Sequence, residues 1–228
     1  MLSFCAGQSP CTSMLSFCAG LSLRISMPTM PLIAVTGGIG CGKTTVLGCF
    51  QKQGCLTLDA DELAHEMYLP GTEAWRQMTD RWGKGILAAD GSVDRKAVAS
   101  IVFAEQRELA WLNQLLHPLL REEIQRRGRQ DQGVFTFCAV PLLYELGWLD
   151  GFDAVVATWC PREVQRERLR LRGWSDGEID ARLRTQLAAE EKLERADYGI
   201  VTSCTWESLD EQCAELLALL KQRFAKKD

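Results

Sequence analysis

The stretch Gly37-Gly38-Ile39-Gly40-Cys41-Gly42-Lys43-Thr44-Thr45 decides the fold of this chain. It fits the phosphate-binding pattern G-x-x-x-x-G-K-[ST], in which Gly37 comes first and Thr44 last. The glycines let the backbone curl so that successive N–H groups point at phosphate oxygens, and the following helix N-terminus adds a partial positive charge. The pattern therefore predicts a nucleoside triphosphate site, with Lys43 reaching the β- and γ-phosphates and the Thr44 hydroxyl holding Mg²⁺.

The segments on either side of this loop are those that a phosphate-binding loop requires. Residues 32–36 form a short apolar run that predicts a buried strand, and residues 43–50 can form a helix. A glycine-rich turn that binds nothing is the alternative interpretation. The motif has the correct spacing and lies between an expected strand and an expected helix, which disfavours that alternative.

The composition narrows the class of protein. The chain has 228 residues, of which 46% are hydrophobic and 25% charged, as in an ordinary globular protein with one α/β domain. A net charge of −4 gives no general attraction for nucleic acid, and no apolar run is long enough to span a bilayer. The 10 cysteines are irregularly spaced without a C-x-x-C pair, which favours reduced thiols in a cytoplasmic protein.

Residues 1–30 differ from the rest of the chain. They contain no acidic residue and one basic residue, and the heptapeptide at residues 1–7 recurs at residues 14–20. They lack the charged start and long apolar core of a secretory signal. We expect a disordered extension without a function, with Met27 or Met30 as the working start and residues 31–228 as a single domain.

Beyond residue 31, apolar segments alternate with helical patterns, which predicts a parallel sheet. Besides 32–36, we expect strands at residues 55–58, 134–140, 153–158 and 198–201. Asp59 and Asp61 follow the second of these strands, so they emerge at the sheet edge that carries the phosphate loop. Their alternative role is to cap and begin the next helix, and one residue can serve each purpose.

A mostly helical stretch follows, and residues 62–130 form an insertion where a phosphoryl-transfer enzyme would hold its acceptor. We expect Pro118 to interrupt the helix that contains Trp111, because proline removes a backbone donor and disfavours helix at the preceding residue. A single histidine such as His117 is more often structural than a ligand.

Residues 168–195, after the fourth expected strand, lie within a segment rich in arginine. It contains a capping-box pattern from Ser175 to Glu178, which predicts the start of a second helix. Because arginine suits forked contact with phosphate, we favour a phosphate-clamping lid, with a solvated basic surface as the alternative. The arginines in question are Arg162, Arg166, Arg168, Arg170, Arg172, Arg182 and Arg184.

Two absences help to choose among nucleotide-binding classes. The chain has no Asn-Lys-x-Asp base-reading motif, which disfavours a GTPase, and the strand at 134–140 runs into Pro141 instead of the acid typical of motor and transport ATPases. A small-molecule kinase remains, with an acid that accepts the proton of the acceptor hydroxyl and arginines that offset phosphoryl charge.

Several further blocks accompany the phosphate loop in a fixed order. They are Asp59-Ala-Asp61, Asp90-Gly-Ser-Val-Asp-Arg95, Leu116-His-Pro-Leu119, Val140-Pro-Leu-Leu-Tyr-Glu145, Gln165 with Arg168 and Arg172, and Gln186 followed by Ala196-Asp-Tyr198. With these blocks the chain resembles the dephospho-coenzyme A kinase family from Ile33 to about Leu219. The loop alone is shared by many families, whereas the ordered set is much more specific.

The resemblance implies a three-layer α/β P-loop kinase fold with a parallel five-stranded sheet, a helical substrate subdomain and an arginine-rich lid. It implies that ATP, with Mg²⁺, phosphorylates the ribose 3′-hydroxyl of dephospho-coenzyme A in the last step of coenzyme A synthesis. We also expect a monomer that acts without nucleic acid or membrane.

On matching positions, the resemblance implies that Asp61 is the general base, that Lys43 steadies the γ-phosphate and that Arg168 closes over the phosphates. Asp59 would support Asp61 or the metal shell. The expected nucleotide-binding residues are Gly37, Gly38, Ile39, Gly40, Cys41, Gly42, Lys43, Thr44, Thr45 and Arg172, and the expected acceptor residues are Asp59, Asp61, His117, Pro141 and Leu142.

The chain departs from the family pattern at Cys41, Thr44 and Thr202, where the family usually has Ser or Ala, Ser, and Asn. Two other functions stay open. A nucleoside monophosphate kinase of related architecture is disfavoured by the blocks in the insertion, and a nucleotide-dependent binding protein without turnover would show no ADP formation with any acceptor.

Overall fold

The computed structural model describes residues 30–130 and 134–225. The expectation for residues 1–30 therefore falls almost entirely outside the described residues. The elements in chain order are β1 (Leu32–Gly37), α1 (Lys43–Lys52), β2 (Leu56–Asp59), α2 (Ala60–Glu66), α3 (Glu73–Trp82), the 3₁₀ turn η1 (Lys84–Ile86), α4 (Arg95–Ala104), α5 (Gln106–Gly128), β3 (Thr136–Ala139), β4 (Ala154–Trp159), α6 (Arg162–Leu171), α7 (Asp176–Leu183), α8 (Ala189–Arg195), β5 (Tyr198–Val201) and α9 (Trp206–Ala225).

The five strands form one sheet in the order β2-β3-β1-β4-β5, and all neighbours are parallel. The predicted parallel sheet is confirmed, and the five strands lie within a residue or two of their expected places. Parallel strands place all their carboxyl ends at one edge of the sheet. The phosphate loop after β1 and the acids at the end of β2 therefore meet at that edge.

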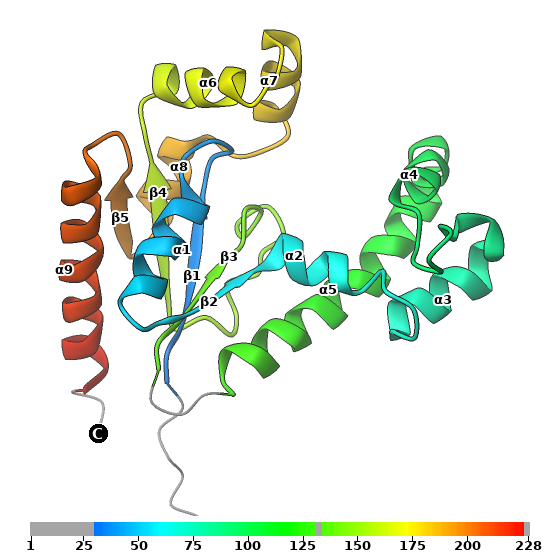
Figure 1. Cartoon of the computed structure of the whole chain (residues 1–228), viewed down its shortest axis with the longest axis horizontal. Helices are drawn as coiled ribbons and strands as arrows, with labels where there is room; N and C mark the ends of the chain where they lie inside the picture. The colour runs from blue at the N-terminus through cyan, green and yellow to red at the C-terminus, as the bar shows by residue number, and fades with distance from the viewer. Residues whose placement is uncertain (1–29, 131–133, 226–228) are drawn as a thin grey trace, which may run out of the picture.

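Side chains of the central strand alternate between two hydrophobic layers. Leu32 and Ala34 pack with α2 and α5, whereas Ile33 and Val35 pack with α1 and α9. This alternation follows from the two-residue period of a strand whose faces are both covered. Figure 1 shows the resulting layers, with α1 and α9 on one side of the sheet, α6 and α7 above its carboxyl edge, and α3, α4 and most of α5 projecting to the right.

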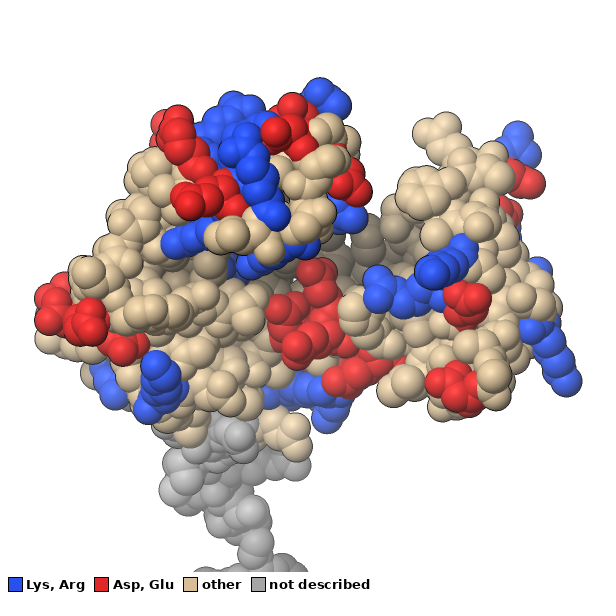
Figure 2. Space-filling view, turned by 45° about the horizontal axis from the view of Figure 1, so that its top comes forward, with Lys and Arg blue, Asp and Glu red and all other residues tan. Residues whose placement is uncertain are grey.

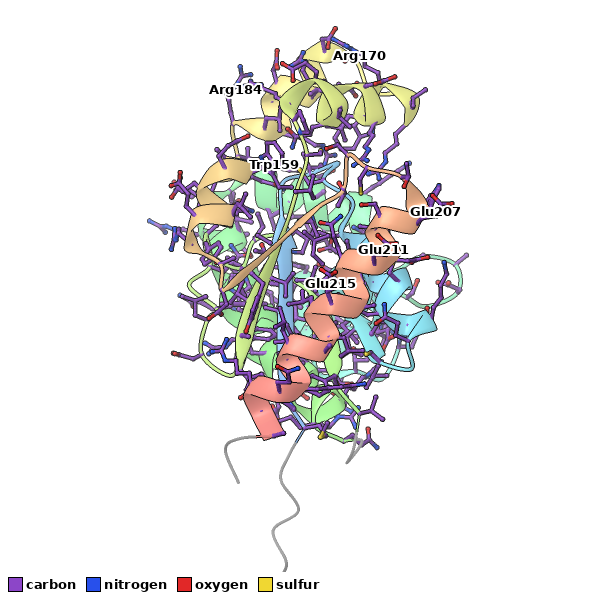
Figure 3. All side chains as sticks on the ribbon, turned by 90° about the vertical axis from the view of Figure 1, so that its left-hand side faces the viewer. Trp159, Arg170, Arg184, Glu207, Glu211 and Glu215 are labelled. Atoms are coloured by element: carbon purple, nitrogen blue, oxygen red, sulfur yellow. The ribbon has the colours of Figure 1, made fainter. Side chains whose placement is uncertain are left out.

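The closing helix α9 is amphipathic. It buries Leu209, Cys213, Leu216, Leu217 and Leu220 against the sheet. In Figure 3, Glu207, Glu211 and Glu215 follow one another along its outer side. The buried residues recur mostly every three or four positions, which is the spacing of a helix with one apolar face. Within the described part of the chain, no helix is both long and apolar enough to cross a membrane.

The expected interruption at Pro118 is wrong. Helix α5 runs without a break from Gln106 to Gly128, with Pro118 inside it. Leu112, Leu115 and Ile124 are buried on both sides of the proline, and they anchor the helix to one continuous core. Tertiary packing along the whole length outweighs the lost hydrogen bond, because most helical stability in proteins comes from an apolar face.

Candidate functional site

The phosphate loop adopts a backbone shape that depends on its glycines. Gly40 and Gly42 have φ of 79° and 81°, in the left-handed region that favours glycine. At Gly37 a Cβ atom would lie 2.4 Å from the Thr158 carbonyl oxygen on the neighbouring strand, so no larger residue fits there. The loop ends at Gly42, the N-cap residue of α1, and the free N–H groups of that helix face the loop interior.

Lys43 lies across this loop. Its Nζ donates to the carbonyl oxygens of Gly37 and Gly38, each at 3.0 Å. Burial, helped by the nearby charge of Lys192, lowers the pKa of Lys43 to about 8, although Cys41, Asp61 and Asp59 act in the opposite direction. The ammonium is thus held in a partly desolvated position at the loop, where an anion would interact with it strongly.

The two acids after β2 have separate roles in the structure. Asp59 is the N-cap residue of α2, and its Oδ1 accepts from the backbone N–H of Asp61 at 2.9 Å. Asp61 lies in the first turn of α2 and lines the same pocket as Lys43. Burial raises the pKa of Asp61, and the negative charge of Asp59 raises it further. Of the two roles that the sequence left open for these acids, the structure assigns capping to Asp59, and a catalytic role of Asp61 stays a prediction.

This pocket, which we call the phosphate pocket, has a volume of about 360 Å³. It brings together the loop, the two acids, the segment after β3 and the arginine-rich segment. Its lining residues are Ile39, Gly40, Gly42, Lys43, Thr44, Thr45, Asp59, Asp61, Pro141, Arg172, Trp174, Arg182 and Gln186. Figure 2 shows basic and acidic side chains interspersed over the α6–α7 end, a group of acidic side chains below them, and a hollow toward the helical insertion.

Helix α6 is attached directly to the phosphate loop. Gln165 Nε2 donates to the Ile39 carbonyl at 2.7 Å, and Arg168 donates to the hydroxyl and carbonyl oxygens of Thr202 at 2.9 and 2.6 Å. The Thr202 hydroxyl in turn donates to the Cys41 carbonyl at 3.2 Å. Thr202, a departure from the family pattern, therefore connects the loop, α6 and the end of β5.

A second pocket of about 260 Å³ adjoins the phosphate pocket and shares Gly40, Gly42, Thr45 and Arg172 with it. We call it the base pocket. Its other lining residues are Arg168, Thr202, Cys204, Thr205, Trp206 and Leu209. Trp206, at the start of α9, is 66% exposed. Sequence reasoning missed Trp206, because no short motif marks it.

The arginines of the α6–α7 segment do not act as one group. Arg166 forms ion pairs with Asp176 and Asp180, and Arg170 pairs with Asp176, so these two hold α6 to α7. Figure 3 shows Arg170 at the outer end of this segment, away from the sheet. Arg168, Arg172 and Arg182 line the two pockets instead. The predicted capping box at Ser175 is present and begins α7.

The remaining expected site residues lie in different places. Pro141 lines the phosphate pocket. His117 lies in α5 with its ring edge-on to Trp148, 5.2 Å between centroids, and burial lowers its pKa. Leu142 follows Pro141 in the turn after β3 and is half-buried. Contact of His117 and Leu142 with a substrate stays a prediction.

Cys41 occupies a small apolar space beneath the loop. Its side chain is fully buried, and its sulfur lies 3.8 Å from that of Cys160 at the end of β4. Ala189 completes the cluster. A thiol suits this space because cysteine behaves as a small buried apolar residue. Cys41 therefore fits the packing under the loop.

With this geometry in place, comparison with known proteins is informative. The family model described as dephospho-CoA kinase matches residues 31–207. A dephospho-CoA kinase from Anaeromyxobacter dehalogenans is 40% identical over 197 residues, which cover 84% of this chain and 93% of the relative.

Solved structures agree with this match. A crystal structure from Thermus thermophilus superposes with a TM-score of 0.71 at 30% identity, covering 84% of this chain and 98% of the other. The dephospho-CoA kinase from Campylobacter jejuni superposes with a TM-score of 0.59 at 23% identity over the same shares, and supports the fold.

Proposed function

We propose that this chain, which belongs to the dephospho-CoA kinase family, transfers the γ-phosphoryl group of ATP to the ribose 3′-hydroxyl of dephospho-coenzyme A. This family performs the last step of coenzyme A synthesis with ATP. The observation that supports the proposal most directly is the phosphate pocket, where Lys43 and Asp61 line one cavity.

Asp61 is the residue that would take the proton of the acceptor hydroxyl. The burial and the Asp59 charge that raise its pKa make it a better base, since a general base works best with a pKa near the working pH. Its place on the first turn of α2 fixes the carboxylate relative to the phosphate loop. Lys43 and the amides of the loop would hold the terminal phosphates while the hydroxyl approaches.

The residues present also fit Mg²⁺. The Thr44 hydroxyl and the carboxylates of Asp59 and Asp61 line the phosphate pocket, and hard oxygen donors of this kind suit that ion. Bound with the phosphates, Mg²⁺ would offset their negative charge.

The adjoining base pocket sets the direction of ATP. Because the two pockets share Gly40, Gly42 and Thr45, one polyphosphate chain can pass from one to the other along the loop. The base would then lie against Trp206, with Arg168 and Arg172 between base and terminal phosphate. Aromatic faces accept stacked bases, and arginine suits phosphate oxygens.

The acceptor would enter from the side opposite the base pocket. Asp61, Pro141 and Gln186 line the phosphate pocket and do not line the base pocket. The helical insertion, residues 62–130, would hold the rest of dephospho-coenzyme A, and α6–α7 would act as the lid. A monomer located in the cytoplasm, without nucleic acid or membrane partners, is part of the same proposal and comes from the sequence.

The test is a coupled ADP-release assay with MgATP that offers dephospho-coenzyme A, AMP, CMP and shikimate in parallel. We expect turnover with dephospho-coenzyme A and at most background with the others. A preference for AMP or CMP would establish a nucleoside monophosphate kinase instead, and tight ATP binding without ADP formation would indicate a binding protein.

A further inference from the structure

A buried ion pair lies beside the acceptor side of the phosphate pocket, among residues that the proposed chemistry does not use. Lys192, on α8, has a fully buried side chain, and its Nζ lies 2.8 Å from Glu145 Oε1. The same Nζ donates to the Pro141 carbonyl oxygen at 2.6 Å. Buried charges are costly to desolvate, and such a pair often stabilises a protein no better than apolar residues of similar size. Stability alone therefore gives little reason for a buried pair at this place.

The pair connects two segments that are far apart in sequence. Glu145 Oε1 also accepts from the backbone N–H of Leu187 at 2.9 Å, so one oxygen binds both Lys192 and the segment between α7 and α8. Lys192 binds the other segment, after β3, through the Pro141 carbonyl. Arg195, one turn further along α8, lies over the Tyr144 ring at 4.3 Å and adds a second contact to that segment.

Both connected segments line the phosphate pocket. Pro141 belongs to one of these segments, and Gln186, the neighbour of Leu187, belongs to the other. Gln186 Oε1 is buried and has no hydrogen-bond partner within residues 30–130 and 134–225. Buried amide oxygens in proteins are nearly always paired, so this oxygen suits a donor from a bound molecule, such as a hydroxyl or amino group.

Glu145 is held as a carboxylate in this setting. Burial raises the pKa of Glu145, but the hydrogen bonds from Lys192 and Leu187 outweigh burial and leave the pKa below its usual value. The Lys192 charge also reaches Lys43, whose pKa it lowers. Removal of one partner would therefore leave an uncompensated buried charge next to the phosphate loop.

We propose that Glu145 and Lys192 are positioning residues for the acceptor, holding the Pro141 turn and Gln186 at a set separation across the pocket that contains Asp61. This inference rests on the proposed function, because it names the acceptor side of the same site. Neither residue touches the reacting atoms, and their effect acts through Pro141 and Gln186.

The experiment compares three variants of the full chain: E145L, K192M and the double variant E145L/K192M. Each single variant leaves one buried charge unpaired, so we expect both to lose thermal stability strongly. The double variant removes both charges and is expected to recover most of the melting temperature. Despite that recovery, we expect its KM for dephospho-coenzyme A to rise on the order of tenfold, with KM for MgATP within about twofold of wild type.

A control pair separates positioning from stability. Arg223 on α9 and Asp197 before β5 form an ion pair outside the helical insertion, with 3.4 Å between Arg223 Nη1 and Asp197 Oδ1, and neither residue lines the two pockets. R223M is expected to lower stability slightly and to leave both KM values near wild type. Return of both stability and acceptor KM to wild-type levels in E145L/K192M would overturn the proposal, since the pair would then be structural only.

Two further outcomes are informative. Should the double variant fail to fold, E145Q keeps an oxygen for Leu187 and Lys192 but removes the charge. A raised acceptor KM in E145Q supports the inference, and a normal one contradicts it. If wild type itself turns over no dephospho-coenzyme A, the proposed function fails, a result that the variants alone cannot produce.

Discussion

The phosphate loop and the α6–α7 segment, which we propose as the lid, would bind the same part of the nucleotide by opposite means. The loop consists of backbone, with glycines at φ values near 80° and one lysine, and all of it comes from nine consecutive residues. The lid, α6 and α7, would bind through long arginine side chains. Side chains of α6 form hydrogen bonds with Ile39, Gly40 and Thr202.

This difference shows that arginines close together in the sequence can have different roles in the structure. Two of the lid arginines, Arg166 and Arg170, bind acids of the lid itself, whereas Arg168 and Arg172 line the pockets. Arg166 and Arg168 are two residues apart on one helix, so they point to different sides. The backbone site depends on its glycines, while the side-chain site depends on which few arginines face inward.

The largest expected effect comes from the loop. K43M removes the only side-chain cation of the motif, and we expect kcat to fall on the order of a thousandfold, as for loss of a preorganised donor to transition-state charge. Steady-state ADP release is the measurement. K52M, at the exposed end of α1, is the control and should retain wild-type turnover. If K43M kept more than a tenth of wild-type kcat, the loop would be a scaffold only.

At the acid edge, D61N should retain ATP binding and lose turnover by about a hundredfold or more, because a general base is removed. Isothermal titration calorimetry measures the affinity for ATP, and the rate of ADP release measures turnover. Asparagine keeps the size of the side chain, so a folding defect is not expected. Near-normal turnover in D61N would leave Asp61 with a structural role in the first turn of α2.

The lid provides a matched pair of substitutions on one helix. R168M removes a guanidinium that lines the base pocket. We expect KM for ATP to rise by about tenfold, which is the loss of affinity expected when one charged hydrogen bond is removed. R166M removes a guanidinium of the same size that binds Asp176 and Asp180. It should cost about 1 kcal/mol or less of unfolding free energy and leave KM for ATP nearly unchanged. Equal effects of the two variants on KM would contradict the division of the lid into two faces.

The smallest expected effect is a shift in the pH profile of kcat/KM. In the wild type, activity should fall at low pH as Asp61 is protonated, at a raised pKa, and at high pH as Lys43 loses its charge near pH 8. In D59N the lost negative charge favours ionised Asp61 and disfavours charged Lys43. Both pKa values therefore decrease, and the whole profile should move to lower pH by less than about one unit.

Asparagine at position 59 is also a good N-cap residue, so α2 should remain in place. Melting temperature is the accompanying measurement and is expected to change little. A profile that stays fixed would show that Asp59 and Asp61 are not electrostatically coupled.

The sequence alone determined the parallel sheet, the phosphate loop and the edge at which the two acids emerge. These features depend on short-range patterns, namely glycines, apolar runs and the spacing of one motif, which act over ten residues or fewer. The capping box at Ser175 belongs to the same class, because its partners lie three residues apart.

Only the tertiary structure decided which side chains face the pockets. Arg168 meets Thr202 across 34 residues, and Lys192 meets Pro141 across 51, distances at which no sequence pattern specifies a partner. The same holds for α5, which stays continuous through Pro118 because residues of distant segments pack along its whole length. Local backbone preference acts along the chain, whereas the direction of a long side chain is settled by the charges and cavities that folding brings to it.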